Sequence, residues 1–92
     1  MTTFAIYRKL ACRNAEYRLW EVMSGKDAAQ AMRRACLMHN LGESPSFGGR
    51  VRRPGEASRQ YWYCAGWDMM IRRASRNEIE LKRESGRRIA DG

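Results

Sequence analysis

The sequence has few cysteines, few prolines and no long apolar segment. Only three cysteines and two prolines occur among 92 residues. The cysteines are odd in number and form no CxxC pair, which argues against a disulfide framework and for a reducing compartment. No apolar run approaches the roughly 20 residues that cross a bilayer, and basic residues interrupt the opening MTTFAIYRKLACR before a signal-type segment could form. We therefore expect a cytosolic protein without membrane association.

The sequence also lacks the clusters of carboxylates or histidines that metal-dependent or acid-base catalysis requires. Its ten acidic residues are scattered, its one histidine has no evident serine or cysteine partner, and no HExxH, GxSxG or GxxxxGK[ST] pattern occurs. The pair Gly48-Gly49 lacks the spacing and the lysine of a nucleotide-phosphate loop. We expect a binding protein rather than an enzyme.

The cysteines and the histidine leave open the alternative of a zinc site. Cys36 and His39 stand three residues apart on an expected helix, and with Cys12 and Cys64 they could supply a Cys3His zinc site. Isolated cysteines commonly act as small buried hydrophobes, however, and no closely paired ligands occur. We expect the thiols in the core, His39 at its boundary, and neither a cofactor nor a metal.

Positive charge dominates what the sequence does contain. Eighteen basic residues against ten acidic ones give a formal net charge of +8, and 15 of the basic residues are arginine. A planar guanidinium suits bidentate contact with phosphate, base edges or carboxylate, although a GC-rich genome also encodes arginine preferentially. The charge predicts an anionic partner, either a nucleic acid or an acidic protein surface.

The hydrophobic pattern predicts one small α+β domain over residues 1–92. Alternation over residues 4–12 and the aromatic-rich segment 17–23 predict two strands that form a hairpin. Arg8 is a misfit on the apolar face, which a bulge or an edge position would explain. A capping-box-like start at Ser24 predicts a helix to Asn40.

The second half predicts further strands and a short helix. Residues 61–73 indicate one long bent strand or a hairpin that turns near Ala65-Gly66. A second capping box from Ser75 to Glu78 opens a helix that we expect to stop at Gly86, leaving residues 86–92 as a frayed basic tail. The expected fold is an antiparallel sheet of three to four strands packed against one main helix, in the order ββαβ(β)α.

Residues 41–59 show no convincing period and are predicted to be a long basic loop rich in glycine and proline. Its glycines permit positive φ angles and Pro54 fixes its own φ, so the loop could present Arg50, Arg52 and Arg53 from nearly one place. Such a loop is typical of a nucleic-acid-contacting arm. The alternative is an ordinary solvated basic loop.

Aromatic residues lie among arginines directly after this loop. Rings that stack on bases beside guanidinium groups that neutralise phosphates are typical of single-strand platforms, whereas in the alternative interpretation the rings fill the core. The candidate partner-binding or RNA-binding residues are Arg50, Arg52, Arg53, Arg59, Arg33, Arg34, Tyr61 and Trp62.

From MTTFAIYRKLACRNAEYRLWEV through GKDAAQAMRRACLMHN to ESGRRIADG, the chain resembles, over its full length, the small phage-encoded anti-CRISPR proteins directed at the type I-F surveillance complex. Anti-CRISPR proteins share no common motif, so no functional residues carry over. The resemblance implies a non-enzymatic inhibitor, in the host bacterial cytoplasm, that binds Cas subunits with their guide RNA and prevents target DNA from pairing.

The net charge narrows this mechanism. A protein of +8 is a poor imitation of DNA, so we expect the loop arginines to clamp the guide RNA while apolar and aromatic surface docks on Cas subunits. We expect a monomer. The alternatives are a free-standing nucleic-acid-binding module, such as a small phage transcription regulator, and a scaffold or virion protein with an acidic partner.

Overall fold

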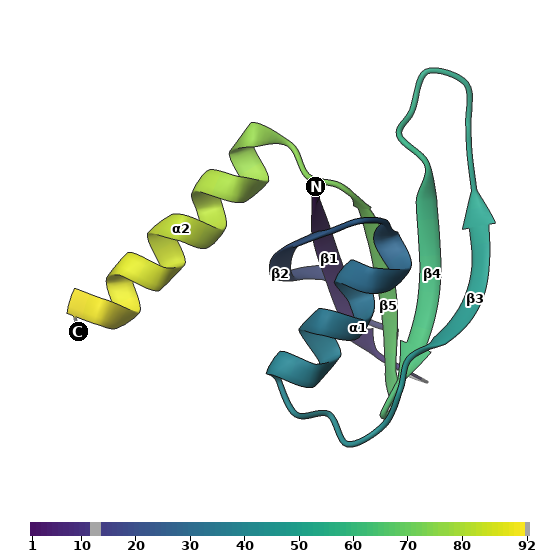
Figure 1. Cartoon of the computed structure of the whole chain (residues 1–92), viewed down its shortest axis with the longest axis horizontal. Coiled ribbons are helices and arrows are strands. Elements are labelled where there is room, and N and C mark those ends of the chain that lie inside the picture. Colours follow the sequence, from purple (N-terminus) through teal and green to yellow (C-terminus); the bar gives the residue numbers. More distant parts are fainter. Residues whose placement is uncertain (12–13, 92) are drawn as a thin grey trace.

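The chain forms one antiparallel sheet with two helices (Figure 1). The computed structural model describes residues 1–11 and 14–91. The elements in chain order are β1 (Thr2–Leu10), β2 (Arg18–Gly25), α1 (Ala28–Met38), β3 (Ser46–Val51), β4 (Arg59–Cys64), β5 (Trp67–Arg73) and α2 (Arg76–Asp91). The strand order in the sheet is β2-β1-β5-β4-β3. The α+β class is therefore confirmed, but the sheet has five strands instead of three to four, and the order is ββαβββα.

The predicted first hairpin is confirmed, since β1 pairs with β2 in antiparallel register. The register shifts between Ile6 and Tyr7, where β2 contributes one extra residue. Because of this bulge, the consecutive residues Trp20 and Glu21 both contact His39. A central strand, β1 also pairs with β5 on its other side.

Helix α1 covers one face of the sheet. Its N-cap is Asp27, whose carboxylate accepts a hydrogen bond from the Gln30 amide at 2.8 Å, so the predicted start at Ser24 is wrong by one turn. The helix lies so close to β2 that a Cβ on Gly25 would come within 2.8 Å of the Ala31 backbone nitrogen. The buried residues of α1 are Ala28, Ala31, Met32, Ala35 and Cys36.

The stretch 41–59 contains a strand that the sequence analysis did not predict. β3 pairs with β4 at the edge of the sheet, so the expected long loop shortens to a connection before β3 and a hairpin loop after it. Two glycines and side chains that are almost all exposed remove the alternation by which strands are recognised. The ladder with β4, formed by residues distant in sequence, holds β3 in place.

The last three elements, β4, β5 and α2, agree largely with the sequence prediction. β4 and β5 form a hairpin through Ala65-Gly66, as one of the two alternatives predicted. In α2 the capping box is confirmed, because the Ser75 amide donates to Glu78 Oε1 at 2.8 Å and the Glu78 amide donates to Ser75 Oγ at 3.2 Å. The helix continues past Gly86 to Asp91, so the predicted stop is wrong, since one glycine weakens a helix by only about 1 kcal/mol. Gly92 lies outside the described residues.

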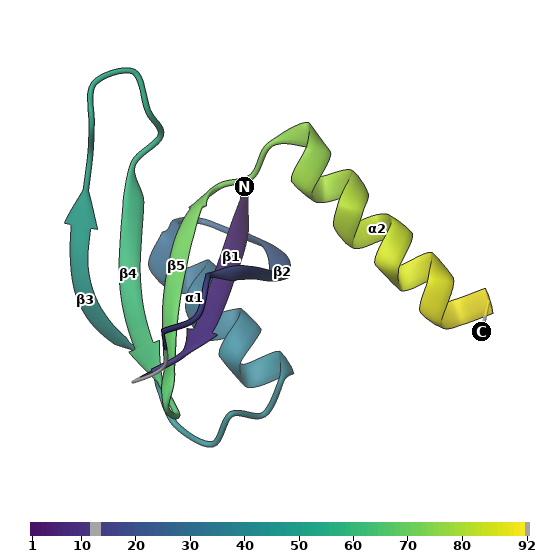
Figure 2. The ribbon, with the colours of Figure 1, turned by 180° about the vertical axis from the view of Figure 1, so that it is seen from behind.

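The two faces of the sheet carry different aromatic residues. The three tryptophans, Trp20, Trp62 and Trp67, belong to or pack against the core beneath α1. The tyrosines of β1 and β4 alternate with core residues and therefore point to the other face. Viewed from behind, the strands lie in front of α1 and α2 lies to one side, so this second face has no helix over its centre (Figure 2). Neither helix of the described chain has the length and apolar character needed to cross a membrane.

Candidate nucleic-acid interface

The hairpin of β3 and β4 forms an arm that extends beyond α1 (Figure 1). Its loop turns where the Glu56 amide donates to the Arg53 carbonyl oxygen at 3.1 Å and Gly55 adopts a φ of 78°. Arg50, Arg52 and Arg53 are all exposed. The arginines predicted to project from one place therefore do lie on one short arm, which is held by strand pairing at its base.

The arm carries arginines on both of its faces. Arg50 pairs with Gln60, whereas Arg59 pairs with Val51, one position along, so their side chains leave opposite faces of the ladder. Arg59 Nη2 lies 3.9 Å from Glu56 Oε2, and both side chains remain partly exposed. Such a surface ion pair is weak, at roughly 0 to 1 kcal/mol, so a phosphate could displace Glu56.

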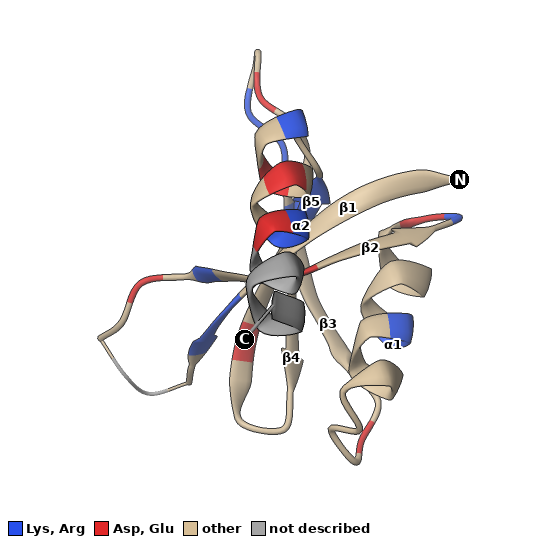
Figure 3. Ribbon diagram, turned by 90° about the vertical axis from the view of Figure 1, so that its left-hand side faces the viewer, with Lys and Arg blue, Asp and Glu red and all other residues tan. Residues whose placement is uncertain are grey.

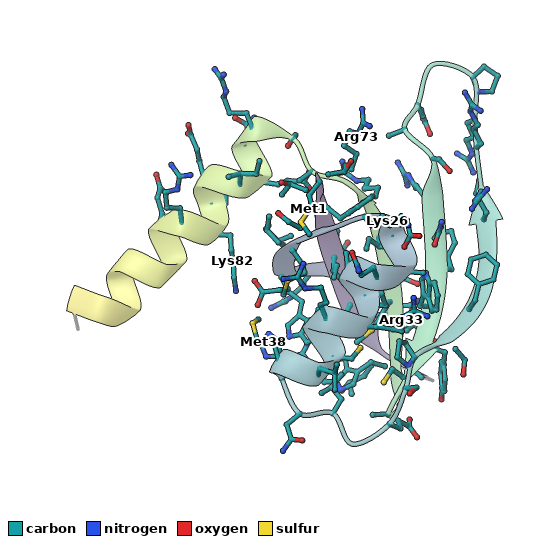
Figure 4. The ribbon with its side chains drawn as sticks, in the orientation of Figure 1. Met1, Lys26, Arg33, Met38, Arg73 and Lys82 are labelled. Atoms are coloured by element: carbon teal, nitrogen blue, oxygen red, sulfur yellow. The ribbon has the colours of Figure 1, made fainter. Side chains whose placement is uncertain are left out.

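Two hollows lie at the arm, and one of them also reaches β1 and β5. A small one, of about 60 Å³, is lined by Val51, Arg53, Glu56, Ala57, Arg59 and Tyr61. The other, of about 350 Å³, is lined by Phe4, Arg52, Glu56, Ala57, Ser58 and Arg73. The second hollow adds Arg73 to the predicted arginines, and Figure 4 labels this residue at the end of β5. Arg73 could not be predicted as part of this group from the sequence, because only the strand order places the end of β5 beside the loop.

The predicted helix arginines lie apart from the arm. Arg33 and Arg34 are exposed on α1, and Arg34 Nη1 donates to the Ser24 carbonyl oxygen at 2.9 Å. Arg33 borders a hollow of about 380 Å³ between α1 and the connection to β3, which shares no lining residue with the two hollows at the arm. Figure 3 shows basic positions on the arm and on α1, separated by strands. The structure thus divides the predicted arginines into two groups.

The two predicted aromatic residues of β4 face opposite ways. Trp62 packs against the core, its indole Nε1 donates to Gln60 Oε1 at 3.1 Å, and its ring meets Phe47 edge-on at a centroid distance of 5.2 Å. Core filling is therefore the role that the contacts of Trp62 indicate. Tyr61 pairs with Met70 and points to the face of the sheet opposite α1, which we call the open face. Tyr61 and Trp62 therefore cannot contact one flat partner together.

The open face gathers tyrosines from different parts of the chain. Tyr17 reaches over the sheet to Tyr61, with ring centroids 6.4 Å apart, and the Lys9 ammonium lies 5.1 Å from the centre of the Tyr17 ring. Burial, together with the charge of Asp68 and the neighbouring Tyr61, raises the pKa of Tyr17. Tyr63, two positions beyond Tyr61 on β4, is 48% exposed. Tyr61 and Tyr63 share a face because they are two positions apart on β4, whereas Tyr17 joins them only through the fold.

Arg8, the predicted misfit on the apolar face of its strand, does lie on the helix side of the sheet. Its guanidinium carbon is 3.9 Å from the centre of the Trp67 ring and 4.9 Å from that of Trp20, an arrangement that satisfies a cation by contact with two π faces. Burial lowers the pKa of Arg8. Arg8, Trp20 and Trp67 border an open groove of about 680 Å³ together with Arg18. Neither an edge position nor a bulge in its own strand accounts for Arg8.

The cysteine and histidine residues have partners other than metal. Cys36 and Cys64 are free and buried, and burial together with the neighbouring Cys64 thiol raises the pKa of Cys36 to about 12. His39 Nε2 lies 2.8 Å from Glu21 Oε2. Within residues 1–11 and 14–91, no three residues of the metal-ligating kinds are grouped so that they could hold an ion. Cys12, the remaining member of the zinc alternative, lies outside the described residues.

In the described part of α2, Glu78 and Lys82 attach the helix to the sheet. Glu78 accepts a hydrogen bond from the Tyr7 hydroxyl and another from Arg72 Nη2 at 2.9 Å. Burial alone would raise the pKa of Glu78, but the hydrogen bonds from Tyr7 and Ser75 and the charge of Arg72 outweigh it and lower the pKa. One turn further along, Lys82 points from α2 toward the sheet (Figure 4) and donates to the Trp20 carbonyl oxygen at 3.1 Å.

No known protein family, curated protein or solved structure matches this chain.

Proposed function

We propose that this protein is a phage inhibitor of type I-F CRISPR-Cas immunity that binds the Cas subunits with their guide RNA and blocks target DNA binding. The observation that carries the proposal is the arm of β3 and β4, which presents three exposed arginines beyond the body of the domain. Guanidinium groups on a narrow arm can reach the phosphates of an RNA strand held along a protein surface. The full-length sequence resemblance suggests which complex holds that strand.

The net charge supports contact with the guide RNA. A chain of +8 is repelled by the basic channel that receives DNA and is attracted to the RNA backbone and to acidic patches on Cas subunits. Base pairing with the guide reads the target sequence, so an inhibitor that covers the guide or the DNA path abolishes recognition. No catalytic step is needed for this mode of inhibition.

Exposed apolar side chains supply a second contact. Leu37 and Met38, at the end of α1, are 80% and 58% exposed. Figure 4 labels Met38 on the side of the molecule away from the arm. Apolar residues exposed together are suited to a protein partner. We assign this end of α1 to a Cas subunit and the arm to RNA, so that one monomer bridges the two in the host cytoplasm.

The experiment that tests the proposal measures the binding of labelled target duplex to purified type I-F guide complex, with and without the protein added beforehand. We expect the protein to abolish DNA binding. The triple variant Arg50→Ala/Arg52→Ala/Arg53→Ala should inhibit at least about tenfold more weakly, because charge-assisted contacts contribute about 1.5 to 3 kcal/mol each when both partners are desolvated. Its thermal stability should be unchanged, since exposed substitutions shift stability by about 0.5 kcal/mol or less.

A matched variant separates position from charge. Arg18, Arg76 and Arg83 are also exposed and lie away from the arm, so replacing these three with alanine removes the same charge. This control should inhibit like the parent. Undiminished DNA binding in the presence of the parent protein would overturn the proposal, and tight binding to naked RNA or DNA would then favour the free-standing nucleic-acid-binding module. Equal loss in both triple variants would mean that net charge acts without the arm.

A further inference from the structure

We propose that the open face of the sheet is a stacking platform for unpaired RNA bases, formed by Tyr17, Tyr61 and Tyr63. The inference deepens the proposed function, since in the bacterial cell the strand on this face would be guide RNA. The platform consists of tyrosine rings and does not include the guanidinium groups of Arg50, Arg52 and Arg53. Its chemistry is recognition of base rings by aromatic rings, which needs no particular base sequence.

The platform follows from the register of three strands. Tyr61 and Tyr63 are two positions apart on β4, so they point to the same face, roughly 7 Å apart along the strand. Tyr61 pairs with Met70 on β5, which in turn pairs with Tyr7 on β1. Met70 is 7% exposed and so forms an apolar floor between Tyr61 and Tyr7.

Tyr17 enters this face from the connection between β1 and β2. In Figure 3, α1 lies on one side of the strands and this connection extends to the other. Although β2 is at one edge of the sheet, the Tyr17 ring reaches the ring of Tyr61 on β4, at a tilt of 54°. The tilt leaves the two rings unstacked. A base can therefore lie on either ring without first separating a stacked pair.

Basic residues lie beside Tyr17 and beside Tyr61, at the two ends of the platform. Lys9 lies over Tyr17, and Tyr61 lines the small hollow of the arm together with Arg53, Arg59 and Glu56, the ion-pair partner of Arg59. A strand crossing from Tyr17 to the arm would therefore meet cations at both ends. The arm arginines and the platform would hold successive parts of the same RNA.

Asp68 lies near the centre of this surface and limits how RNA could lie on it. Asp68 pairs with Lys9 on one side and with Tyr63 on the other. A carboxylate repels phosphate but accepts hydrogen bonds from base amino groups. We therefore expect bases, and not phosphates, over the centre of the face. Duplex RNA cannot use such a surface because its bases are already paired and stacked.

The test measures binding of the full-length protein to a fluorescent, unstructured RNA of about 12 nucleotides, a length within the range of single-strand sites. Fluorescence anisotropy compares the parent with Tyr63→Leu and Tyr17→Leu. Each leucine variant should bind about tenfold more weakly, because a base stacked on an aromatic ring contributes from about fivefold to more than a hundredfold in affinity. Tyr63→Phe keeps the ring and should bind within about twofold of the parent.

Two controls keep the test specific. Phe47→Leu removes a ring that is 55% exposed on the helix side of the sheet and should leave RNA affinity unchanged. A duplex RNA of the same length should bind the parent and Tyr63→Leu equally. Thermal unfolding of each variant identifies any loss caused by misfolding, and Tyr63 is exposed enough that its replacement should leave the unfolding temperature unchanged.

Several results would overturn the platform. Unchanged RNA affinity in both leucine variants would do so, as would an equal loss in Phe47→Leu. If Tyr63→Leu bound RNA like the parent but no longer bound the guide complex, the tyrosines would contact a Cas protein instead. The proposed function would survive each of these results if the parent still blocked target capture. Conversely, tyrosine-dependent RNA binding without any block of target capture would support the platform and reject the inhibitor.

Discussion

At the scale of single residues, Glu78 links local capping to tertiary structure. Its carboxylate satisfies the amide at the start of α2 and also accepts hydrogen bonds from Tyr7 on β1 and Arg72 on β5. One buried side chain therefore fixes where α2 begins and which strands it touches. Because these donors favour the charged carboxylate, the pKa of Glu78 is lowered in the folded state.

We predict that Glu78→Gln lowers the free energy of unfolding at neutral pH by about 1 to 3 kcal/mol, the range for a broken buried network. A lowered folded pKa stabilises the protein above the unfolded value, near 4.3, and this stabilisation disappears as pH falls through the folded pKa. The parent should thus lose its advantage over Glu78→Gln below about pH 4. Urea unfolding across this pH range measures it.

Glu80 offers a matched control, because it lies in the same helix and is exposed. Glu80→Gln should change stability by about 0.5 kcal/mol or less at every pH. If the two glutamine variants behaved alike, the network around Glu78 would not stabilise the fold.

At the scale of elements, the turn between β4 and β5 contains a residue poorly suited to its backbone. Ala65 and Gly66 have φ angles of 52° and 82°, as a two-residue turn of type I′ requires. A non-glycine residue in this region costs about 1 to 2 kcal/mol, and asparagine is the side chain that tolerates it best. The Glu43 carboxylate accepts a hydrogen bond from the Ala65 amide and helps to hold the turn.

We predict that Ala65→Asn raises the free energy of unfolding by about 0.5 to 1 kcal/mol, measured as a higher urea midpoint with an unchanged slope. Ala65→Val should lower it, because a β-branched residue resists positive φ. Both substitutions keep the backbone amide that Glu43 binds. A less stable asparagine variant would contradict the turn geometry.

At the scale of the whole molecule, charge and stacking can be separated by salt. Each phosphate that the protein neutralises on a single strand contributes about 0.7 to the negative slope of log affinity against log salt concentration. Stacking contributes affinity but little slope. The arm arginines and the open face should therefore respond differently to the same titration.

We predict that the arm triple variant reduces the slope for single-stranded RNA by about 2, whereas Tyr63→Leu lowers affinity at every salt concentration and leaves the slope unchanged. Anisotropy titrations at several salt concentrations measure both quantities. A slope change in Tyr63→Leu would mean that the tyrosine variant had displaced charged contacts.

The sequence predicted those parts of the molecule that local interactions determine. The capping box at Ser75, the presence of helix α1, though not its start, and the first hairpin each depend on residues close together in the chain. β3 was missed because its edge position and glycines leave no period, and its stability comes from pairing with β4. The arginines of the arm were predicted as a group, but their separation from those of α1 depends on the packing of the helix over the sheet.

The sorting of aromatic residues between the two faces gives the protein two intrinsic optical reporters. Fluorescence excited selectively in tryptophan reports only on the helix side of the sheet, where all three indoles contact the core. Tyrosine emission comes in part from the open face, where Tyr17, Tyr61 and Tyr63 lie. A ligand that stacks on the open face should quench tyrosine emission while tryptophan emission stays constant, and unfolding should change both. Occupancy of that face and integrity of the fold can thus be followed in one unlabelled sample.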